Sequence, residues 1–200
     1  MSKKEEVKKK IGKSAMECFA KFGLDKTTLE DIAKAVGLNK TSLYYYYKSK
    51  EDIFIEVALE EGENYIHSLQ SATIQKVGIE NRTAFYLESR FNYYKNVLNM
   101  NRVSVESMGK LLPRFFELYD ALMIREKAFL TQLLEEAVKE GELELKDPKN
   151  TASVLINFSN ALKHSVEQQA ILKQEPEIDY SQSLQDTKFL VSLIFKGIKK

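Results

Sequence analysis

The sequence predicts an all-α protein, with three short helices in a helix-turn-helix arrangement over residues 1–52 and a larger helical domain over residues 53–200. Apolar residues recur along most of the chain at the three- and four-residue spacing of one helix face. Only 3 prolines and 8 glycines occur in 200 residues, which fits long helices joined by few loops. No segment alternates apolar and polar residues as a half-buried strand does.

The first two helices are marked by an apolar stripe, a stop signal and a capping pair. Gly23 directly follows the stripe and predicts the end of the first helix. Thr27 and Glu30 have the spacing of a capping box, so we expect the second helix to begin near Thr28. Gly37 then permits the left-handed backbone of a tight turn. The stripe of the first helix comprises Val7, Ile11, Ala15, Cys18, Phe19 and Phe22.

A short third helix and a long fourth one follow the turn. Asn39 can cap a helix over about residues 40–46, and Ser49 can cap a helix that runs on past Tyr65. The small side chain of Ala33 lets the third helix cross closely over the second. Two helices joined by a short turn that contains glycine form a helix-turn-helix.

The rest of the chain predicts further helices and few loops. Pro113 is expected to separate two of these helices, and Gly141 to end the second of that pair. Asp147 followed by Pro148 is typical of a cap and a first helical position. Residues 174–182, QEPEIDYSQ, predict a loop. The expected helices lie near residues 82–99, 102–110, 114–140, 148–172 and 183–198.

Charge is distributed unevenly along the chain. Residues 1–50 hold 12 Lys/Arg and 6 Asp/Glu, and residues 51–200 hold 18 and 23, although the formal net charge is only +1. A basic N-terminal quarter on an acidic remainder fits a chain that offers one end to a polyanion. The alternative is a solvated lysine-rich tail. Lys3, Lys4 and residues 8–10 are either such a mobile tail or a salt-dependent, non-specific contribution to binding.

Several functional classes find no support in the sequence. No run of about 18 apolar residues is present, so no membrane span is expected, and the N-terminal MSKKEEVKKK does not lead into the apolar stretch of a secretory signal. The single Cys18 cannot form an internal disulfide, so we expect a cytoplasmic protein. There is no glycine-rich phosphate loop, no HExxH and no metal-spaced cysteine set, and His67 and His164 lie in different predicted helices. We therefore expect neither an enzyme nor a bound cofactor or metal.

Four consecutive tyrosines occur in the stretch TSLYYYYKSKEDI, residues 41–53. Successive helix positions are about 100° apart, so the four rings cannot share one face. Leu43 is expected to face inward, and Tyr47, four residues later, shares its face. Tyr44, Tyr45 and Tyr46 then lie off the core face.

The same short helix carries residue types that can read DNA. The second helix of a helix-turn-helix enters the major groove, where small or polar side chains reach base edges and flanking groups hold phosphates. Lys40 can donate to guanine, Thr41 can bond to a base or touch a thymine methyl, and Ser42 can bond to a base or a phosphate. Tyrosine combines an apolar ring for thymine methyls with a hydroxyl for phosphates. Lys50, at the start of the next helix, can join its amides in holding an anion.

The stretch TTLEDIAKAVGLNKTSLYYYYKSKEDI resembles the DNA-binding signature of TetR-family transcriptional repressors. The resemblance covers about residues 8–55, because the first helix and both caps also fall in register. Tyr47 stands where the family often has Phe, so its hydroxyl needs a partner or a route to solvent, and Tyr46 stands where His is common. The matching residues are Ile32-Ala33, Val36-Gly37-Leu38, Thr41-Ser42-Leu43-Tyr44 and Lys48-Ser49-Lys50.

The resemblance implies that a set of residues contacts double-stranded operator DNA. This set comprises Thr28, Lys40, Thr41, Ser42, Tyr44, Tyr45, Tyr46 and Lys50. The residues expected to contribute most to sequence choice are Lys40, Thr41 and Tyr45. Those expected mainly to hold phosphates are Thr28, Tyr46 and Lys50.

The resemblance also implies a homodimer that pairs through the last two helices, residues 148–172 and 183–198, as a four-helix bundle. Such a dimer presents two reading helices to half-sites about 34–36 Å apart, or a multiple of the helical turn, and so predicts a pseudo-palindromic operator. The apolar residues available for core and interface are Val154, Leu155, Phe158, Leu162, Val166, Phe189, Leu190, Leu193, Ile194 and Ile198.

A small-molecule effector pocket in the helical body is a third implication of the resemblance. Effector binding would shift the population towards a dimer whose reading helices are wrongly spaced for DNA. Because aromatics are many and plausibly buried charges few, we expect a mostly apolar effector, such as a lipid-like acid, an aromatic or a cationic drug. Ordinary core packing is the alternative for every candidate. The candidates are Phe91, Tyr94, Phe115, Tyr119, Phe129, Asn157, Phe158 and His164.

These observations predict a ligand-responsive, homodimeric DNA-binding repressor of transcription. The alternative is a helical adaptor that binds another protein and has no sequence-specific affinity for DNA. The adaptor hypothesis leaves the basic N-terminal quarter and the full motif unexplained.

Overall fold

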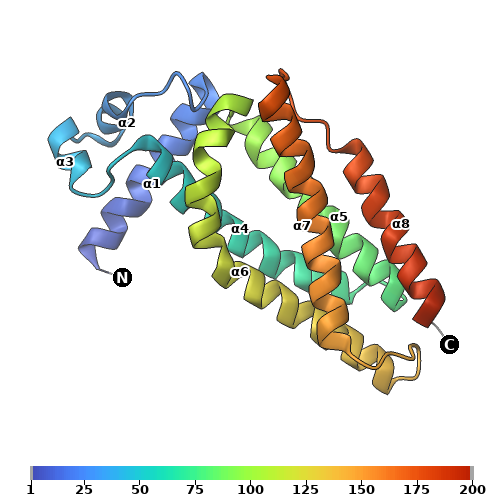
Figure 1. Ribbon diagram of the computed structural model, residues 1–200. Coiled ribbons are helices and arrows are strands. Elements are labelled where there is room, and N and C mark those ends of the chain that lie inside the picture. The colour runs from blue at the N-terminus through green and yellow to red at the C-terminus, as the bar shows by residue number, and fades with distance from the viewer. Residues whose placement is uncertain (1, 199–200) are drawn as a thin grey trace.

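The computed structural model describes residues 2–198, and within that range it leaves the side chains of residues 99, 114–119 and 121 undescribed. The described residues form helices and no strands (Figure 1). Three helices make up an N-terminal group, the head: α1 (Lys3–Phe22), α2 (Leu29–Val36) and α3 (Lys40–Tyr44). The others make up the body: α4 (Lys50–Ile74), α5 (Ile79–Met100), α6 (Val105–Lys139), α7 (Pro148–Lys173) and α8 (Ser181–Ile198).

Helix α2 begins at the expected place but is capped by a different pair of residues. Thr28 is the N-cap: its hydroxyl accepts the backbone N–H of Asp31 at 3.2 Å, and Asp31 accepts the backbone N–H of Thr28 at 2.9 Å. The capping box predicted for Thr27 and Glu30 is therefore wrong by one residue. Thr27 is buried instead, and its hydroxyl donates to the carbonyl of Gly23 at 2.8 Å, which closes the loop between α1 and α2.

The turn between α2 and α3 is the glycine turn that the sequence predicts. Gly37 has φ +75° and ψ 26°, and the N–H of Leu38 donates to the carbonyl of Ala33 at 2.9 Å. Asn39 caps α3 by accepting the N–H of Ser42 at 2.7 Å. These contacts fix the angle at which α3 leaves α2.

Helix α3 is shorter than predicted and ends at Tyr44 rather than near residue 46. The N–H of Tyr46 donates to the carbonyl of Leu43, three residues back, at 2.9 Å, so the last turn tightens and the chain leaves the helix. The N–H of Tyr47 also donates to Leu43, at 3.1 Å, which keeps Tyr47 on the Leu43 face. Ser49 then caps α4 as expected, by accepting the N–H of Asp52 at 3.0 Å.

Helix α4 passes from one hydrophobic core into the other. The head core includes Phe19, Ile32 and Leu43, and it continues into α4 through Ile53, Phe54 and Ile55. The body core takes over at Ile66 of the same helix. The boundary predicted between residues 52 and 53 thus falls inside a continuous helix rather than in a linker.

In the body, α7 packs along α6 and beside α8, while α5 packs against α8 (Figure 1). The prediction that Pro113 separates two helices is wrong, because α6 runs from Val105 to Lys139 with Pro113 inside it. Proline removes one backbone hydrogen bond and crowds the carbonyl four residues back, which bends a helix rather than ending it when both halves are packed. Figure 1 shows α6 changing direction along its length.

The remaining helix ends follow the predicted signals closely. Asp147 accepts the N–H of Asn150 at 2.9 Å with Pro148 as the first helical residue, and Gly141, with φ +77°, follows the end of α6. The loop before α8 ends at Tyr180, so α8 begins two residues earlier than expected. None of the helices within residues 2–198 combines the length and apolar character that crossing a membrane requires.

Candidate nucleic-acid interface and interior cavity

Helix α3 and the residues that follow it have one face buried against the head core and one face exposed to solvent. Leu43 is fully buried, and Tyr47 is 5% exposed, as predicted from their shared face. Tyr44 and Tyr45, by contrast, are 50% and 71% exposed. Tyr46 lies between these extremes: it packs partly against the head core, and its ring meets that of Tyr45 edge-on, with centroids 5.1 Å apart. The exposed surface therefore centres on Tyr44 and Tyr45.

The polar residues at the start of α3 continue this surface. Lys40 and Thr41 are exposed, and Ser42 is half-buried. These are the first three residues of α3. They remain available to base edges and phosphates.

Thr28 is exposed, but its hydroxyl is already engaged at the start of α2. The hydroxyl donates to the carboxylate of Asp31 at 2.6 Å, and this hydrogen bond lowers the pKa of Asp31. A phosphate contact by Thr28 stays a prediction.

The Tyr47 hydroxyl, which needs a partner or a route to solvent, has a partner on α4. It donates to the Glu56 carboxylate at 2.9 Å, and the same carboxylate accepts from Lys8 Nζ at 2.8 Å. Lys8 Nζ also lies 4.8 Å from the centroid of the Tyr47 ring. Burial, and then the bond to Glu56, raise the pKa of Tyr47, so its phenol stays protonated and acts as donor. This small network joins α1, the segment after α3, and α4.

The N-terminal lysines lie on α1 rather than in a tail. Helix α1 begins at Lys3, with Ser2 as its cap. Lys4 Nζ lies 5.1 Å from the centroid of the exposed Tyr45 ring, so the first turn of α1 borders the end of α3. The basic residues of α1 and the exposed face of α3 thereby form one surface.

Lys50 has a structural role that the sequence does not reveal. Its Nζ donates to the carbonyls of Leu24, Asp25 and Thr27 at 2.7, 2.9 and 2.9 Å. An ammonium has three donor hydrogens, so these carbonyls can use all of them. Lys50 thus ties the start of α4 to the α1–α2 loop, and its predicted contact with a phosphate stays a prediction.

Comparison with known proteins finds a similarity in this part of the chain. Residues 11–57 match the model of the bacterial regulatory proteins of the tetR family. IcaR of Staphylococcus epidermidis, the negative transcriptional regulator of the biofilm operon icaADBC, is 48% identical over 48 residues. Residues 11–57 are therefore similar to the matching segment of tetR-family regulators. The matched segment is 24% of this chain and spans about a quarter of the relative, 26% of its length.

Over the whole chain, the protein shares its fold with solved structures of low sequence identity. A TetR-family regulator from Pectobacterium atrosepticum aligns with a TM-score of 0.70 at 14% identity, covering 100% of this chain and 98% of that one. SmeT, the repressor of the Stenotrophomonas maltophilia multidrug efflux pump SmeDEF, aligns with a TM-score of 0.61 at 18% identity, covering 96% and 90%. These alignments show the common architecture of a helix-turn-helix head on a helical body.

The body of this chain contains a small interior cavity of about 70 Å³, between α4, α5, α6 and α7. Its walls are mainly apolar, with Phe54, Leu59 and Leu111 among the lining residues. Of the candidate ligand residues, Tyr94 lines this cavity. Three charged side chains, which the sequence analysis did not select, also reach the wall: Arg90, Lys163 and Glu167.

The other candidate ligand residues either do not line this cavity or have side chains outside the described residues. Phe91 is buried in packing against Tyr180, with ring centroids 6.1 Å apart, and Phe129 packs on Tyr86 at 5.1 Å. Asn157 and Phe158 do not line this cavity: both are exposed, because α7 turns the neighbouring Ser159 inward and carries them to its outer face, and their contact with an effector stays a prediction. The remaining candidates are His164, which is half-buried and does not line the cavity, and Phe115 and Tyr119, whose side chains lie outside the described residues.

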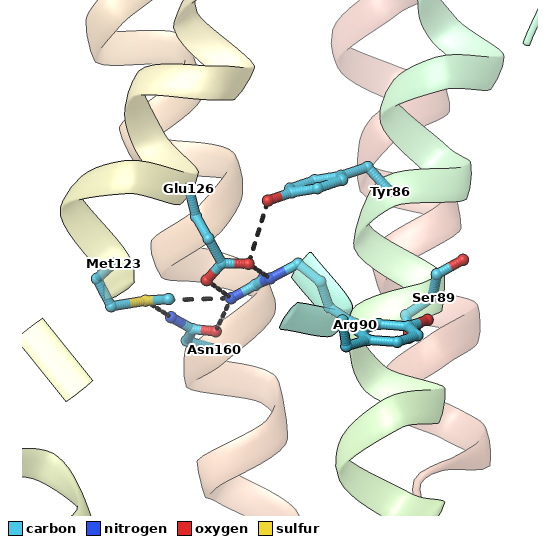
Figure 2. A network of polar contacts seen from close by, with 7 residues as sticks. Tyr86, Ser89, Arg90, Met123, Glu126 and Asn160 are labelled. Atoms are coloured by element: carbon cyan, nitrogen blue, oxygen red, sulfur yellow. Dashed lines mark hydrogen bonds and ion pairs between the residues drawn. The ribbon is translucent and has the colours of Figure 1, made fainter. Parts of the chain in front are cut away.

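The expectation of few buried charges is wrong. Arg90 and Glu126 are 1% and 0% exposed and form an ion pair through two of the guanidinium nitrogens (Figure 2). Glu126 also accepts from the Tyr86 hydroxyl at 3.2 Å, and Arg90 donates to Asn160 Oδ1 at 3.1 Å. The sequence did hold a signal, because Glu126 sits on the four-residue stripe of Leu122, Leu130 and Leu134.

A second buried ion pair lies on α7. Lys163 donates to Glu167 Oε1 at 2.9 Å, and the two side chains are 5% and 0% exposed. Glu167 also accepts from the Tyr180 hydroxyl at 2.9 Å and lies 2.8 Å from His164 Nδ1. Burial alone would raise the pKa of Glu167, but the bonds from His164 and Lys163 outweigh it and lower that pKa. Burial lowers the pKa of Lys163.

Proposed function

We propose that this chain binds double-stranded operator DNA through α3 and represses transcription. The observation that carries the proposal is the division of α3 into a buried anchor, Leu43 with Tyr47, and an exposed face around Tyr45. A helix seated in this way can enter the major groove without disturbing its own core. The printed names of IcaR, a negative transcriptional regulator, and SmeT, a repressor, support the same role.

The proposed contacts divide by exposure and chemistry. Lys40, Thr41 and Tyr45 are exposed and suit base edges and thymine methyls. Tyr44, with half of its surface exposed, and the half-buried Ser42 suit phosphates beside the groove. The other proposed phosphate contacts are Thr28, Tyr46 and Lys50, which are also engaged in packing or capping contacts of the head.

Gel shift and footprinting on DNA from upstream of the chain's own gene test this proposal. We expect a sequence-specific complex at moderate salt and a protected site with two related halves. A complex that forms equally on unrelated DNA, or no complex, would contradict the proposal and favour a helical protein-binding adaptor. A single unsymmetric protected half-site would contradict the dimeric form of the proposal alone.

We also propose that the functional form is a homodimer joined through α7 and α8. These two helices lie side by side (Figure 1). Each carries large apolar side chains that stay exposed in the single chain. Val154 and Phe158 on α7 are 48% and 37% exposed, and Phe189 and Leu193 on α8 are 65% and 49% exposed. Pairing such a surface with its copy removes apolar area from water.

Sedimentation of the purified chain tests the dimer. We expect a dimer that the double substitution Phe158→Asp and Phe189→Asp converts to a folded monomer. Ile124→Asp, which alters an exposed apolar residue on α6, is the matched control and should leave the dimer intact. A monomeric wild type would overturn the proposal.

Ligand responsiveness is proposed to pass through α4. This helix lines the cavity with Phe54, Leu59 and neighbouring residues, and it holds the head through Lys50 and Glu56. A ligand that pushes α4 away from α5 and α7 would therefore move both attachments of the head. In gel shifts, an effector should release the operator complex at concentrations that also raise the melting temperature of the free protein.

A further inference from the structure

We propose that the cavity takes an amphipathic monoanion: a molecule with an apolar body and one carboxylate or similar anionic group, which pairs with Lys163. The inference rests on the proposed function, because it takes the cavity as the effector site, and it names the chemical class of the effector. Lipid-like acids belong to this class, whereas cationic and uncharged apolar molecules do not.

The walls of the cavity suit the apolar part of such a molecule. Helix α4 contributes Phe54, Ile55 and Leu59, and α5 contributes Val97 and Leu98. Burying apolar groups against these residues supplies most of the binding free energy and gives little preference between one apolar body and another. Selection by charge has to come from the few polar groups in the wall.

The charged groups that reach the cavity favour an anion. Two of them, Arg90 and Lys163, are cations, and Glu167 is the one carboxylate among the described lining residues. Glu126 neutralises Arg90, but it is fully buried and is not part of the described cavity wall. Two of the charges that reach the cavity are thus positive and one is negative, and because Glu126 pairs with Arg90, Lys163 is the cation that a ligand anion would meet.

Glu167 has little capacity left for a ligand cation. Its Oε1 accepts from Lys163 and from Tyr180, both at 2.9 Å, and its Oε2 lies 2.8 Å from His164 Nδ1. Because a carboxylate has about four acceptor sites, an incoming ammonium would find at most one of them unused, on Oε2. Any further contact would displace a donor and leave it buried without its acceptor.

Lys163 has capacity to spare. It donates to Glu167 and rests with Nζ 4.7 Å from the centroid of the Tyr94 ring, while an ammonium can donate three hydrogen bonds. A ligand carboxylate could accept one of the unused hydrogens at the cavity wall. It would also offset the burial that lowers the pKa of Lys163.

A second unused donor lies in the same wall. The Tyr93 hydroxyl is buried and has no hydrogen-bond partner among the described residues. Its ring is held by stacking on Tyr65, with centroids 4.3 Å apart. Burial and the charge of Glu61 raise the pKa of Tyr93, so the hydroxyl stays protonated and lacks an acceptor. Lys163 and Tyr93 can therefore each donate a hydrogen bond to an anionic group at the described wall.

The size of the cavity connects this chemistry to the head. About 70 Å³ is far below the roughly 300 Å³ at which drug-sized pockets begin, so such a ligand enters only if the surrounding helices separate. Helix α4 is the wall that also holds the head through Lys50 and Glu56. Anion binding at Lys163 on α7 would wedge the apolar body of the ligand against α4.

Calorimetric titration of the full chain, without DNA, with decanoate, 1-decanol and decylamine tests the proposal. The three probes share one chain length and differ in head group. We expect saturable binding of decanoate, at least tenfold tighter than that of 1-decanol and tighter still than that of decylamine. Equal or tighter binding of either of the other probes, or no saturable binding of decanoate, would overturn the proposal.

Two substitutions place the anion within the cavity. Lys163→Met should weaken decanoate binding at least tenfold and leave 1-decanol binding unchanged. Because this variant unpairs the buried Glu167, Tyr93→Phe serves as the second variant: its hydroxyl has no described partner, so the fold keeps its stability while decanoate binding weakens severalfold. Lys149→Met, an exposed lysine of α7, is the control. Wild-type decanoate affinity in the folded Tyr93→Phe variant and in any folded Lys163→Met variant would overturn the assignment.

Failure of this proposal and failure of the proposed function are distinguishable. If the operator complex forms but decanoate shows no preference, the ligand class is wrong and DNA binding stands. If decanoate binds as expected but no operator complex forms, the cavity assignment stands and the proposed DNA-binding function is wrong.

Discussion

The head of this chain carries its charged groups on the outer surface, whereas the body buries some of its charged groups in the interior. The head core is largely apolar, and the lysines of α1 and the exposed side chains of Lys40, Thr41 and Tyr45 stand outside it. The body instead buries two ion pairs, Arg90 with Glu126 and Lys163 with Glu167. An outward-facing arrangement suits a large polyanion that arrives at a surface, and an inward-facing one suits a small molecule that is enclosed. The difference locates two kinds of recognition in two regions joined by one helix.

The largest expected effect, and the strongest test of this comparison, concerns the buried ion pair of Arg90 and Glu126. We expect Glu126→Gln to lower the free energy of unfolding by about 3–5 kcal/mol, because Arg90 is left charged in the core. Urea unfolding followed by circular dichroism measures this. Glu135→Gln, an exposed position on the same helix, should change it by less than about 0.5 kcal/mol. Similar losses of unfolding free energy in Glu126→Gln and Glu135→Gln would contradict the claim that burial makes a carboxylate important for stability.

The next effect tests the division of the tyrosines. Tyr47→Ala should lower the free energy of unfolding by about 3 kcal/mol, since it empties a buried site and removes the donor to Glu56. Tyr45→Ala should leave stability within about 0.5 kcal/mol but weaken operator binding about tenfold or more. Thermal melts and gel shifts on the two variants decide it. Tyr46→Ala is also expected to weaken operator binding with the fold intact, and equal melting losses in all three variants would refute the division.

A smaller effect separates two neighbouring lysines of the head. Lys50→Met should lower the free energy of unfolding by about 1–3 kcal/mol, because three carbonyls lose a charged donor. Lys48→Met, an exposed position, should leave stability unchanged and reduce by about one the slope of operator affinity against salt concentration. The salt series and unfolding curves are measured on both variants. A stability loss in Lys48→Met, and none in Lys50→Met, would reverse the assigned roles.

The smallest expected effect concerns an ion pair at the surface, which has the same kind of charged groups as the buried pairs. Lys8 pairs with Glu56 at 2.8 Å, but both side chains are substantially exposed, so solvent screens the pair. Lys8→Met should therefore cost about 1 kcal/mol or less in the free energy of unfolding, well below the loss for Glu126→Gln. A cost comparable to that of the buried pair would mean that Lys8 supports Tyr47 more strongly than its exposure allows.

The head could be predicted from sequence because its signals are local. Gly37, Asn39 and Ser49 act within a few residues, and the spacing of Leu43 and Tyr47 alone predicts which tyrosine is buried. The errors in the head are equally local, such as the capping box displaced by one residue.

The body could be predicted as helices but not as a site, because its contacts join residues far apart in the chain. Arg90 finds Glu126 across 36 positions and Asn160 across 70. Helical spacing alone does not distinguish the inner and outer faces of α7, so Phe158 was a candidate ligand contact although it is exposed and does not line the cavity. Lys163 and Glu167, on the other hand, share the four-residue spacing of a buried stripe and could have been selected.

The uninterrupted course of α4 has a consequence for how such proteins can be recombined. Residues 53–55 belong to the head core and Ile66 to the body core, so no point on this helix before residue 56 separates the two without opening one of them. Leu111 of α6 reaches into the head core as well. A chimera that exchanges heads between relatives would therefore have to be joined in the middle of α4, at about residue 60. The surface of α6 around Leu111, which packs against the head, would have to be transferred with it. The reading helix is a transferable module only together with part of the body on which it rests.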